Sequence, residues 1–288
     1  MKNKYYKYRP LYIQKDDGSK RTAPNTESIF TKAEIYYSAP VDCNDPFDCN
    51  LKIHVNDSTD VEWAKYIDDM ITKYTTLNPN SVAALRKVKA GKLWKTNQGI
   101  AMLAGDIGKN TNILNYYESS LFCLAKKGNS IPMFSYYADG HTGIAIELSF
   151  SDDEIPCGID YLSTLNSGTQ KLVFRDVEYP ATFPELNYHR LYNTNDKLLR
   201  HMLFTKSPEW KHEEEFRIFR RKVPKSTSPF DRKLLTRVIL GCKTKTADVD
   251  LVKDWLKGWP SDVILSKTEP ATDKFELLVT DFDVVKGS

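Results

Sequence analysis

Two glutamates and an arginine alternate along one short segment, and their spacing could do chemistry. Glu213, Glu215 and Arg217 are each separated by one residue. Side chains of a strand alternate between its faces, so these three are expected on one face. Neighbouring carboxylates tend to raise the pKa of one of them while an arginine lowers it, which would make a polarising cluster. The alternative is a solvated edge strand whose Glu–Arg pair contributes under about 1 kcal/mol.

A second candidate is Arg9, which follows Tyr8 in an aromatic and basic segment near the start of the chain. If Arg9 ends a strand, its guanidinium could bind a pyrophosphate through two parallel hydrogen bonds. The alternative is a surface arginine near a mobile terminus.

A third candidate combines a strand end with a turn. Residues 34–38 are rich in β-forming side chains and end in Tyr37 and Ser38, and Asn44 opens the turn sequence of residues 44–48. A serine at a strand end could hold a neighbouring carboxylate or a ribose hydroxyl. The alternative is a capping serine followed by an Asx turn. Calcium is not favoured, because the twelve-residue loop with its terminal glutamate is missing.

A fourth candidate is the stretch of residues 133–143. Tyr136, Tyr137 and His141 could form an aromatic wall for a planar ring, whereas the alternative is core packing with His141 in a turn. The sequence has no G-x-S-x-G, no P-loop and no G-x-G-x-x-G. Serine hydrolases of the elbow type, P-loop kinases and GTPases, and dinucleotide-binding dehydrogenases therefore lose their main support.

The composition predicts a soluble globular protein. Hydrophobic residues make up 41% and charged residues 27% of the 288 residues, which argues against bulk disorder. The net charge of +3 argues against a dedicated nucleic-acid coat. No apolar run of 18 residues and no secretory signal occur, so we expect no membrane span and a cytoplasmic protein.

The cysteines and histidines do not predict a metal. The five cysteines are irregularly spaced without a C-x-x-C, and no histidine pair has ligand spacing. Reduced thiols in a cytosol are expected instead.

The elements that must position these residues alternate in type along the chain. Helical periodicity with Trp63 and Ile67 predicts a helical insertion at residues 59–110. We therefore expect a single α+β domain over residues 1–288, with a mixed or antiparallel β core. The other strands are predicted at residues 5–12, 120–125, 144–150, 213–219, 238–241, 263–266 and 275–279, and the other helices at residues 133–137, 194–204 and 247–259.

Residues 5 to about 241 resemble domain-of-unknown-function family 2971. The most specific matching pieces are Asn-Asp-Pro-Phe-Asp at residues 44–48 and Tyr-Ala with His-x-Gly at residues 137–143. Phe134 stands where that family usually carries tryptophan, and the helical stretch 59–110 looks specific to this member.

A second, more distant resemblance links Arg9, Ser38 and the Glu213-x-Glu215 pair to the arginine–serine–glutamate trio of ADP-ribosyltransferases. It implies an ADP-ribosyltransferase-like fold in which Arg9 holds the NAD diphosphate or ribose. Ser38 would steady the nicotinamide ribose, and Glu215, supported by Glu213, would bind the ribose 2′-hydroxyl. The second and third motifs lie farther apart than in the well-known toxins of that superfamily.

The resemblance implies an NAD-consuming enzyme of the glycosyltransferase class that modifies an intracellular protein or nucleic acid, as a toxin with an antitoxin or as an antiviral-defence effector. Cleavage of the nicotinamide–ribose bond develops an oxocarbenium-like centre, which a carboxylate stabilises without any metal. The side chains expected to bind the dinucleotide are Arg9, Tyr8, Tyr37, Tyr136, Tyr137, His141 and Asn44.

Two other functions stay open from the sequence. A non-enzymatic module could bind nucleic acid or a partner protein of a defence or mobile-element system through the basic run from Arg217 to Lys225. A metal-dependent nuclease would require Asp45, Asp48, Glu147 and Glu213 to converge.

Overall fold

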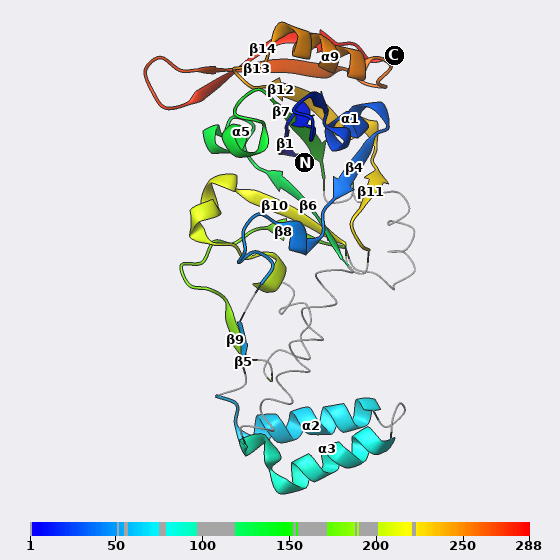
Figure 1. Ribbon diagram of the computed structural model, residues 1–288, viewed down its shortest axis with the longest axis vertical. Coiled ribbons are helices and arrows are strands. Elements are labelled where there is room, and N and C mark those ends of the chain that lie inside the picture. The colour runs from blue at the N-terminus through cyan, green and yellow to red at the C-terminus, as the bar shows by residue number, and fades with distance from the viewer. Residues whose placement is uncertain are drawn as a thin grey trace.

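A mixed sheet of eight strands forms the centre of the molecule, in the order β14-β13-β12-β7-β1-β6-β10-β8 (Figure 1). The computed structural model describes residues 2–50, 52–54, 57–74, 79–96, 119–151, 154, 172–187, 189, 201–220 and 223–288. Neighbouring strands of this sheet are antiparallel except for β12 and β13. The strands are β1 (Asn3–Arg9), β6 (Ser120–Ala125), β7 (Ile144–Phe150), β8 (Leu172–Asp176), β10 (Glu215–Arg220), β12 (Leu235–Leu240), β13 (Val263–Pro270) and β14 (Leu277–Val285). The expectation of an α+β protein with a mixed β core is confirmed.

Helices pack on this sheet through aromatic side chains. Helices α1 (Pro24–Thr31) and α9 (Thr246–Leu256) contribute to the main core, where Phe30 stacks on Trp255 at 5.4 Å. Helix α5 (Ile131–Tyr137) packs against β1, with Phe134 edge-on to Tyr8 at 5.0 Å. Burial of such large rings is a main source of stability.

The sheet opens between β1 and β6. Strand β1 pairs with β7 along its whole length, but it pairs with β6 only at Tyr6 and Ala125. The first half of β6 takes another partner, because Ser38 and Leu121 exchange two backbone hydrogen bonds of 2.9 and 2.8 Å. Ser38 directly follows β4 (Glu34–Tyr37). The end of β1, the start of β6 and the end of β4 therefore surround one opening in the sheet.

The smaller elements surround the sheet and extend from it. Strand β4 pairs with β11, β2 with β3, and β5 with β9. A helical hairpin of α2 and α3 lies at one end of the molecule (Figure 1). The bounds of these elements are β2 (Tyr12–Gln14), β3 (Lys20–Thr22), β5 (Lys52–His54), β9 (Glu185–Asn187), β11 (Ser226–Pro229), α2 (Asp60–Tyr74), α3 (Pro79–Gly91), and the 3-10 helices η1 (Pro40–Asp42), η2 (Leu93–Lys95), η4 (Pro208–Glu213) and η5 (Arg232–Leu234).

Several predicted elements need correction. The first forty residues hold four strands rather than two. The strand predicted at residues 213–219 begins at Glu215, because Glu213 ends η4 and Glu214 has a left-handed backbone with φ of 43°. The last strand covers residues 277–285 rather than 275–279. Parts of the helices predicted at 59–110 and 194–204 lie outside the described residues, and the single-domain organisation stays a prediction.

None of the helices in the described part of the chain combines the length and the apolar character that crossing a membrane would require.

Candidate functional site

A cavity of about 580 Å³ lies at the opening between β1 and β6. Side chains from β1, β6, β10 and α5 line it, together with residues of the turn after η1 and of the segment before η4. Eight of the ten predicted site residues line this cavity: Arg9, Tyr8, Ser38, Asn44, Tyr136, Tyr137, Glu213 and Glu215.

Tyr37 and His141, the other two predicted residues, are not among the lining residues. Tyr37 is fully buried, and the guanidinium of Arg220 lies 3.6 Å from its ring centre. Successive residues of a strand point to opposite sides, so Tyr37 faces the core while the next residue, Ser38, faces the cavity. His141 sits in a turn with φ of 73° and stacks on Phe134 at 5.9 Å.

Arg217 holds two carboxylates with four of its five N–H donors. Its Nε and Nη2 donate to Glu215 at 2.6 and 2.8 Å, and Nη1 and Nη2 donate to Asp48 at 2.7 and 2.6 Å. The second Nη1 hydrogen goes to the carbonyl of Leu203 at 2.7 Å. A guanidinium has five N–H donors, so none is left for a ligand. Burial alone would raise the pKa of Glu215, but Arg217 and then Lys206 lower it to about 2.

Lys206 joins the carboxylates into one cluster. Its Nζ lies 2.6 Å from Glu213, 3.6 Å from Glu215 and 3.7 Å from Asp48. Burial works against its charge, but the three carboxylates raise the pKa of Lys206 overall. Lys206 and Arg217 together carry two positive charges against three carboxylates. With all groups ionised, one negative charge of this cluster is left without a partner inside it.

Glu213 is held differently from Glu215. Its Oε1 accepts the hydroxyl of Tyr137 at 2.6 Å, and its Oε2 accepts the Lys206 ammonium at 2.6 Å. Burial and then Glu215 raise the pKa of Glu213, although Lys206 and Tyr137 oppose the rise. The Asn44 side chain also hydrogen-bonds Tyr137. Glu215 therefore stays ionised, whereas Glu213 is the carboxylate better suited to accept a proton.

The opposite charge lies on β1. Lys7 Nζ donates to the carbonyl of Cys123 at 2.8 Å. The Nε of Arg9 is buried, and it has no hydrogen-bond partner among the described residues. Burial and then Arg9 lower the pKa of Lys7 to about 8, while Glu215 and Glu213 act in the other direction. The pKa of Lys7 therefore responds both to Arg9 and to the two glutamates. The cavity has a cationic part and an anionic part.

The sequence did not single out Lys206 as a site residue, and it singled out Asp48 only as a carboxylate of the nuclease alternative. Asp48 stands in the turn motif of residues 44–48, so its motif was noticed but its ion pair with Arg217 was not. Lys206 stands in Thr-Lys-Ser-Pro, which has no pattern that predicts a function. The strand alternation proposed for Glu213 and Glu215 is also wrong, because Glu213 belongs to η4.

The four carboxylates of the nuclease alternative do not converge. Asp48 and Glu213 line the cavity, but Asp45 and Glu147 are not among its lining residues. Asp45 accepts the backbone N–H of Phe47 at 2.9 Å in an Asx turn. Glu147 accepts hydrogen bonds from Tyr6 at 2.9 Å and Thr236 at 2.8 Å instead.

Two arginines of the basic run from Arg217 to Lys225 lie inside the molecule rather than on its surface. Arg217 and Arg220 are buried, because β10 lies inside the sheet between β6 and β8. Lys225 pairs with Asp42 at 3.2 Å, and residues 221 and 222 lie outside the described residues. Arg217 and Arg220 are therefore not available to bind a phosphate backbone, and the role proposed for the rest of the run stays a prediction.

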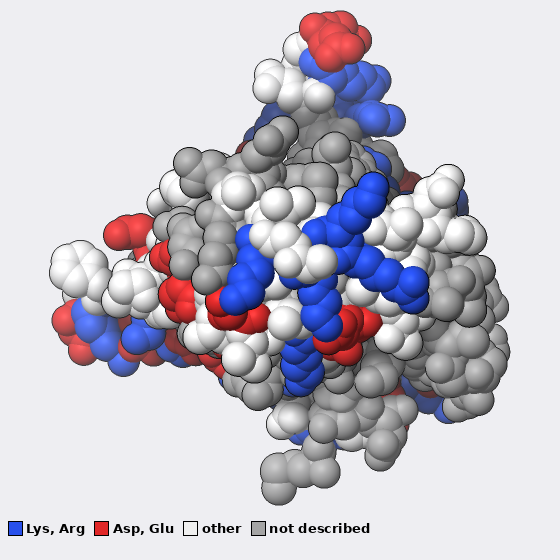
Figure 2. All heavy atoms as spheres, turned by 90° about the horizontal axis from the view of Figure 1, so that it is seen from below, with Lys and Arg blue, Asp and Glu red and all other residues white. Residues whose placement is uncertain are grey.

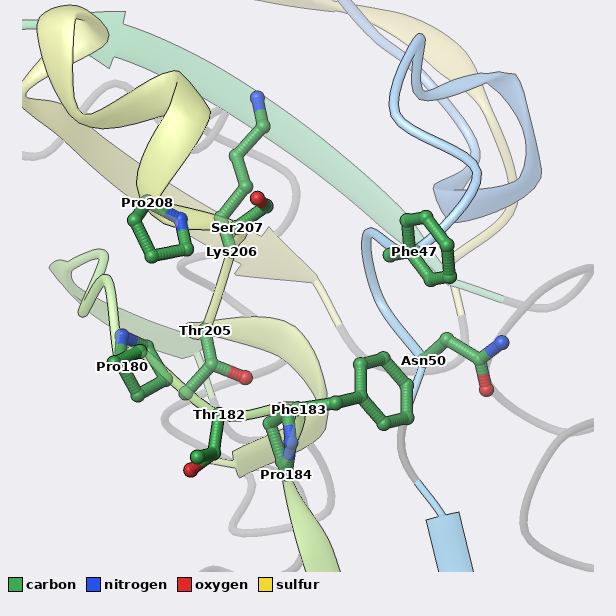
Figure 3. A pocket seen from close by; sticks show the side chains of 11 residues that line it. Phe47, Asn50, Pro180, Thr182, Phe183, Pro184, Thr205, Lys206, Ser207 and Pro208 are labelled. Carbon is green, nitrogen blue, oxygen red and sulfur yellow. The ribbon is translucent and has the colours of Figure 1, made fainter.

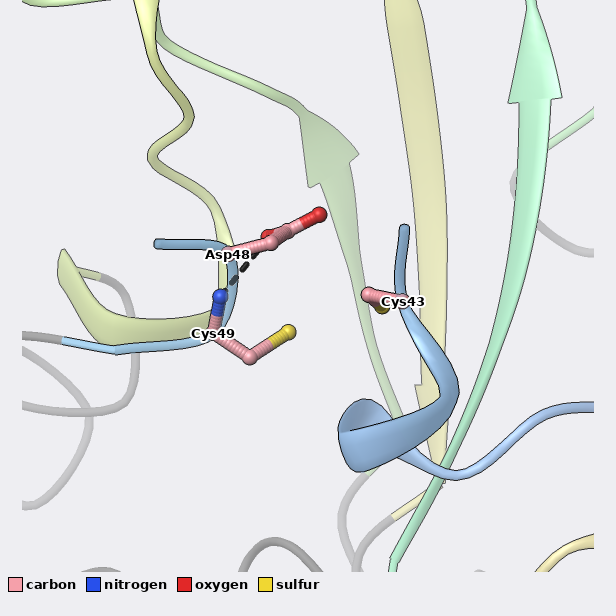
Figure 4. A group of neighbouring side chains, drawn as sticks. All are labelled: Cys43, Asp48 and Cys49. Carbon is pink, nitrogen blue, oxygen red and sulfur yellow. Dashed lines mark hydrogen bonds between the residues drawn. The ribbon is translucent and has the colours of Figure 1, made fainter. Parts of the chain in front are cut away.

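One group in the described part of the chain could in principle hold a metal ion. Cys43, Asp48 and Cys49 offer ligand atoms within 4.8 Å of one another (Figure 4). However, Arg217 already binds both oxygens of Asp48, and its Nη1 lies 3.6 Å from the sulfur of Cys49. A hydrogen bond with Cys43 and then burial raise the pKa of the Cys49 thiol. These contacts indicate that Arg217 anchors Asp48, and they do not favour a metal ion at this group.

Comparison with known families gives one match. Residues 133–218 match DUF2971, a family described as protein of unknown function. This range includes Tyr136, Tyr137, Lys206, Glu213 and Glu215, and it leaves out the cavity residues of β1. No curated protein and no solved structure matches the chain.

Proposed function

We propose that the cavity binds NAD and that the protein is an ADP-ribosyltransferase-like enzyme. One observation carries this proposal: Arg9 is half-buried, its buried Nε has no hydrogen-bond partner among the described residues, and it lines the same cavity as a buried carboxylate cluster. NAD needs both, because its diphosphate is anionic while its nicotinamide ribose develops positive charge during cleavage.

The lining of the cavity suits a dinucleotide. Arg9 would bind the diphosphate, for which the planar guanidinium is well shaped. The rings of Tyr8, Tyr136 and Tyr137 supply aromatic surface for the bases. Ser38 is fixed by its backbone pairing with Leu121, so its hydroxyl is positioned for a ribose hydroxyl. The volume of about 580 Å³ lies inside the range typical of ligand sites.

The two glutamates divide the chemistry in this proposal. The bond between ribose C1′ and the nicotinamide nitrogen breaks, and its electron pair leaves with nicotinamide. Glu215, which Arg217 keeps ionised, stabilises the positive charge that develops at C1′. The acceptor then forms a bond to C1′, and its proton goes to Glu213, whose pKa is raised.

The acceptor in this proposal is a protein or nucleic acid of the cytosol, and the biological setting is that of a toxin or an antiviral-defence effector. This setting follows from the distant resemblance to ADP-ribosyltransferases and not from a contact in the structure.

The test is incubation of the purified protein with NAD labelled in the adenosine part, with and without cell lysate. We expect nicotinamide release and transfer of label, and we expect Glu215→Gln to lower the release at least 100-fold. Glu214→Gln is the matched control, because Glu214 pairs with Lys127 at the surface and is not among the cavity lining. A folded wild-type protein that releases no nicotinamide under any of these conditions would overturn the proposal.

A further inference from the structure

A second, smaller cavity shares a wall with the NAD cavity. Its volume is about 210 Å³, and Lys206 lines both cavities. Figure 3 shows the aliphatic stem of Lys206 beside the small cavity, with the ammonium pointing away from it. That ammonium lies 2.6 Å from Glu213 and 3.6 Å from Glu215. A group bound in the small cavity would therefore lie next to the lysine that contacts both carboxylates.

Two exposed aromatic rings stand at this small cavity. Phe47 is 60% exposed and Phe183 is 44% exposed, and their ring centres are 6.0 Å apart in an edge-on arrangement. Phe47 also immediately precedes Asp48, which lines the NAD cavity. The Asx turn of Asp45 fixes the backbone of Phe47, so one turn holds both the exposed ring and the carboxylate.

The small cavity has both apolar and neutral polar lining residues. Three prolines line it together with the two phenylalanines, and Asn50 and Thr182 are among its polar lining residues. Lys206 is the single charged residue of this lining within the described part of the chain. The exposed phenylalanine rings offer an aromatic surface on which one planar ring can stack.

Basic side chains lie farther along the chain segment that follows Phe47. The chain continues from Phe47 into β5 and from Phe183 into β9, and residue 54 of β5 leads to the α2–α3 hairpin. On this hairpin Lys65, Arg86 and Lys87 are exposed, and no ion pair engages them within the described residues. Figure 2, which views the molecule from the hairpin end, shows Lys and Arg side chains at the centre of this face, with Asp and Glu side chains beside them. The basic side chains of this face are complementary to the phosphates of a nucleic-acid backbone.

We propose that the small cavity is the acceptor site and that it takes an unstacked nucleobase of a single-stranded nucleic acid. This inference rests on the proposed function. A nitrogen of the base forms the new bond to ribose C1′ as the bond from C1′ to nicotinamide breaks. The electron pair of the broken bond leaves with nicotinamide, and the proton of the attacking nitrogen goes to Glu213. Because stacking on rings tolerates any base, recognition depends on strandedness more than on sequence.

The first experiment measures transfer and NAD cleavage in the same reaction. A mixed-sequence single-stranded oligonucleotide is incubated with labelled NAD and either the wild-type protein, Phe183→Ala or Phe47→Ala. We expect transfer to the oligonucleotide to fall at least tenfold in both variants, with nicotinamide release to water within twofold of the wild type. Phe282→Ala is the control, since Phe282 is 46% exposed on β14 and is not part of the cavity. The same oligonucleotide as a duplex is expected to be a poor acceptor.

The second experiment measures binding without NAD, by fluorescence anisotropy of the same labelled oligonucleotide. We expect Phe183→Ala to weaken binding at least tenfold, and we expect Arg86→Glu with Lys87→Glu to weaken it and to flatten its salt dependence. Unchanged oligonucleotide binding in all variants overturns the inference, as does wild-type label that reaches only proteins in a lysate. A third outcome is that the wild type releases no nicotinamide while Phe183→Ala still weakens oligonucleotide binding. This outcome would overturn the proposed function and would support the base-binding site.

Discussion

Among the single residues, Arg217 clamps two carboxylates and has no N–H donor left to bind a ligand. All five of its N–H donors are taken by Glu215, Asp48 and Leu203. Buried ion pairs are weak evidence for stability, because desolvation offsets much of their attraction. The clear effect of this clamp is on geometry and protonation, because it fixes Glu215 at the cavity and keeps it ionised.

The clamp predicts how stability depends on pH. The pKa of Glu215 falls from its ordinary value of 4.5 to about 2 in the folded protein. A depressed carboxyl pKa gives stability that is full above about 4.5 and is lost as the pH falls toward 2. The free energy of unfolding should therefore differ most between wild type and Glu215→Gln at neutral pH. The proton linkage between these two pKa values predicts how this difference in the free energy of unfolding changes with pH. It should be smaller at pH 3 than at neutral pH by about 2 kcal/mol. Urea unfolding across this pH range measures it, and a constant difference would contradict the ionised, clamped state.

Glu213 predicts the pH dependence of nicotinamide release. Its raised pKa means that release should fall as the pH drops through a value above 4.5, because the protonated carboxyl is no longer a base. Lys206 lowers the pKa of Glu213, so Lys206→Met should move this acid limb to higher pH. Lys211→Met is the control, because Lys211 is an exposed residue of the same segment. The rate of nicotinamide release is measured against pH for the wild type and the two variants. An acid limb at the same pH in Lys206→Met as in the wild type would show that Lys206 does not affect the protonation of Glu213.

At the scale of elements, the site depends on a sheet that is not fully paired. The single bridge between β1 and β6 leaves room for the cavity, and the pairing of Ser38 with Leu121 closes its other side. The β-forming side chains of residues 34–38 predicted a strand here, and the observed strand β4 ends at Tyr37, directly before Ser38. These side chains could not predict which edge Ser38 would join, because strand partners are set by contacts far apart in the sequence.

Helix α5 predicts a measurable effect of its N-terminal cap. The hydroxyl of Ser130 accepts the N–H of Met133, and α5 carries Tyr136 and Tyr137 to the cavity. We expect Ser130→Ala to lower the free energy of unfolding by about 1 kcal/mol. Ser135→Ala is the control, since Ser135 is exposed inside the same helix and alanine favours helices. Chemical denaturation compares the two variants, and equal stabilities would show that the cap hydrogen bond contributes nothing.

Sequence reasoning reached the members of the site better than their arrangement. It selected Arg9, Ser38 and the two glutamates from residue type and order, and all four line one cavity. It placed Glu213 on a strand, because the left-handed turn at Glu214 leaves no signal in a residue of ordinary type. It missed Lys206 because a single buried lysine is recognised by its three carboxylate neighbours, and these are brought together only by the fold.

At the scale of the whole molecule, the charge distribution differs from what the net charge suggests. A balance of +3 describes neither the acidic cluster nor the cationic end of β1. Composition counts charges without locating them, so the bipolar cavity could not be predicted from it. The basic run at residues 217–225 shows the same limit, because the fold buries two of its arginines.

The attachment of the helical hairpin predicts a response to acid. His189 is buried, its Nδ1 lies 2.7 Å from the Ser58 hydroxyl, and its ring lies 4.1 Å from Trp63 of α2. Burial lowers the pKa of His189 from 6.5 to about 4. When the segment that carries His189 unfolds, it therefore binds more protons between these two pKa values. The contact between His189 and α2 should weaken as the pH falls from 6.5 toward 4. Hydrogen exchange corrected for intrinsic rates should show less protection in α2 at pH 5 than at pH 7, with β7 unchanged. Equal protection of α2 at both values would exclude His189 as the cause.

The most direct test of the account is a crystal structure of the protein with a non-hydrolysable NAD analogue. We expect the diphosphate within hydrogen-bond distance of the Arg9 guanidinium and the nicotinamide ribose beside Glu215. An analogue bound elsewhere, or bound in this cavity with its diphosphate on the side of Glu213 and Glu215, would contradict it.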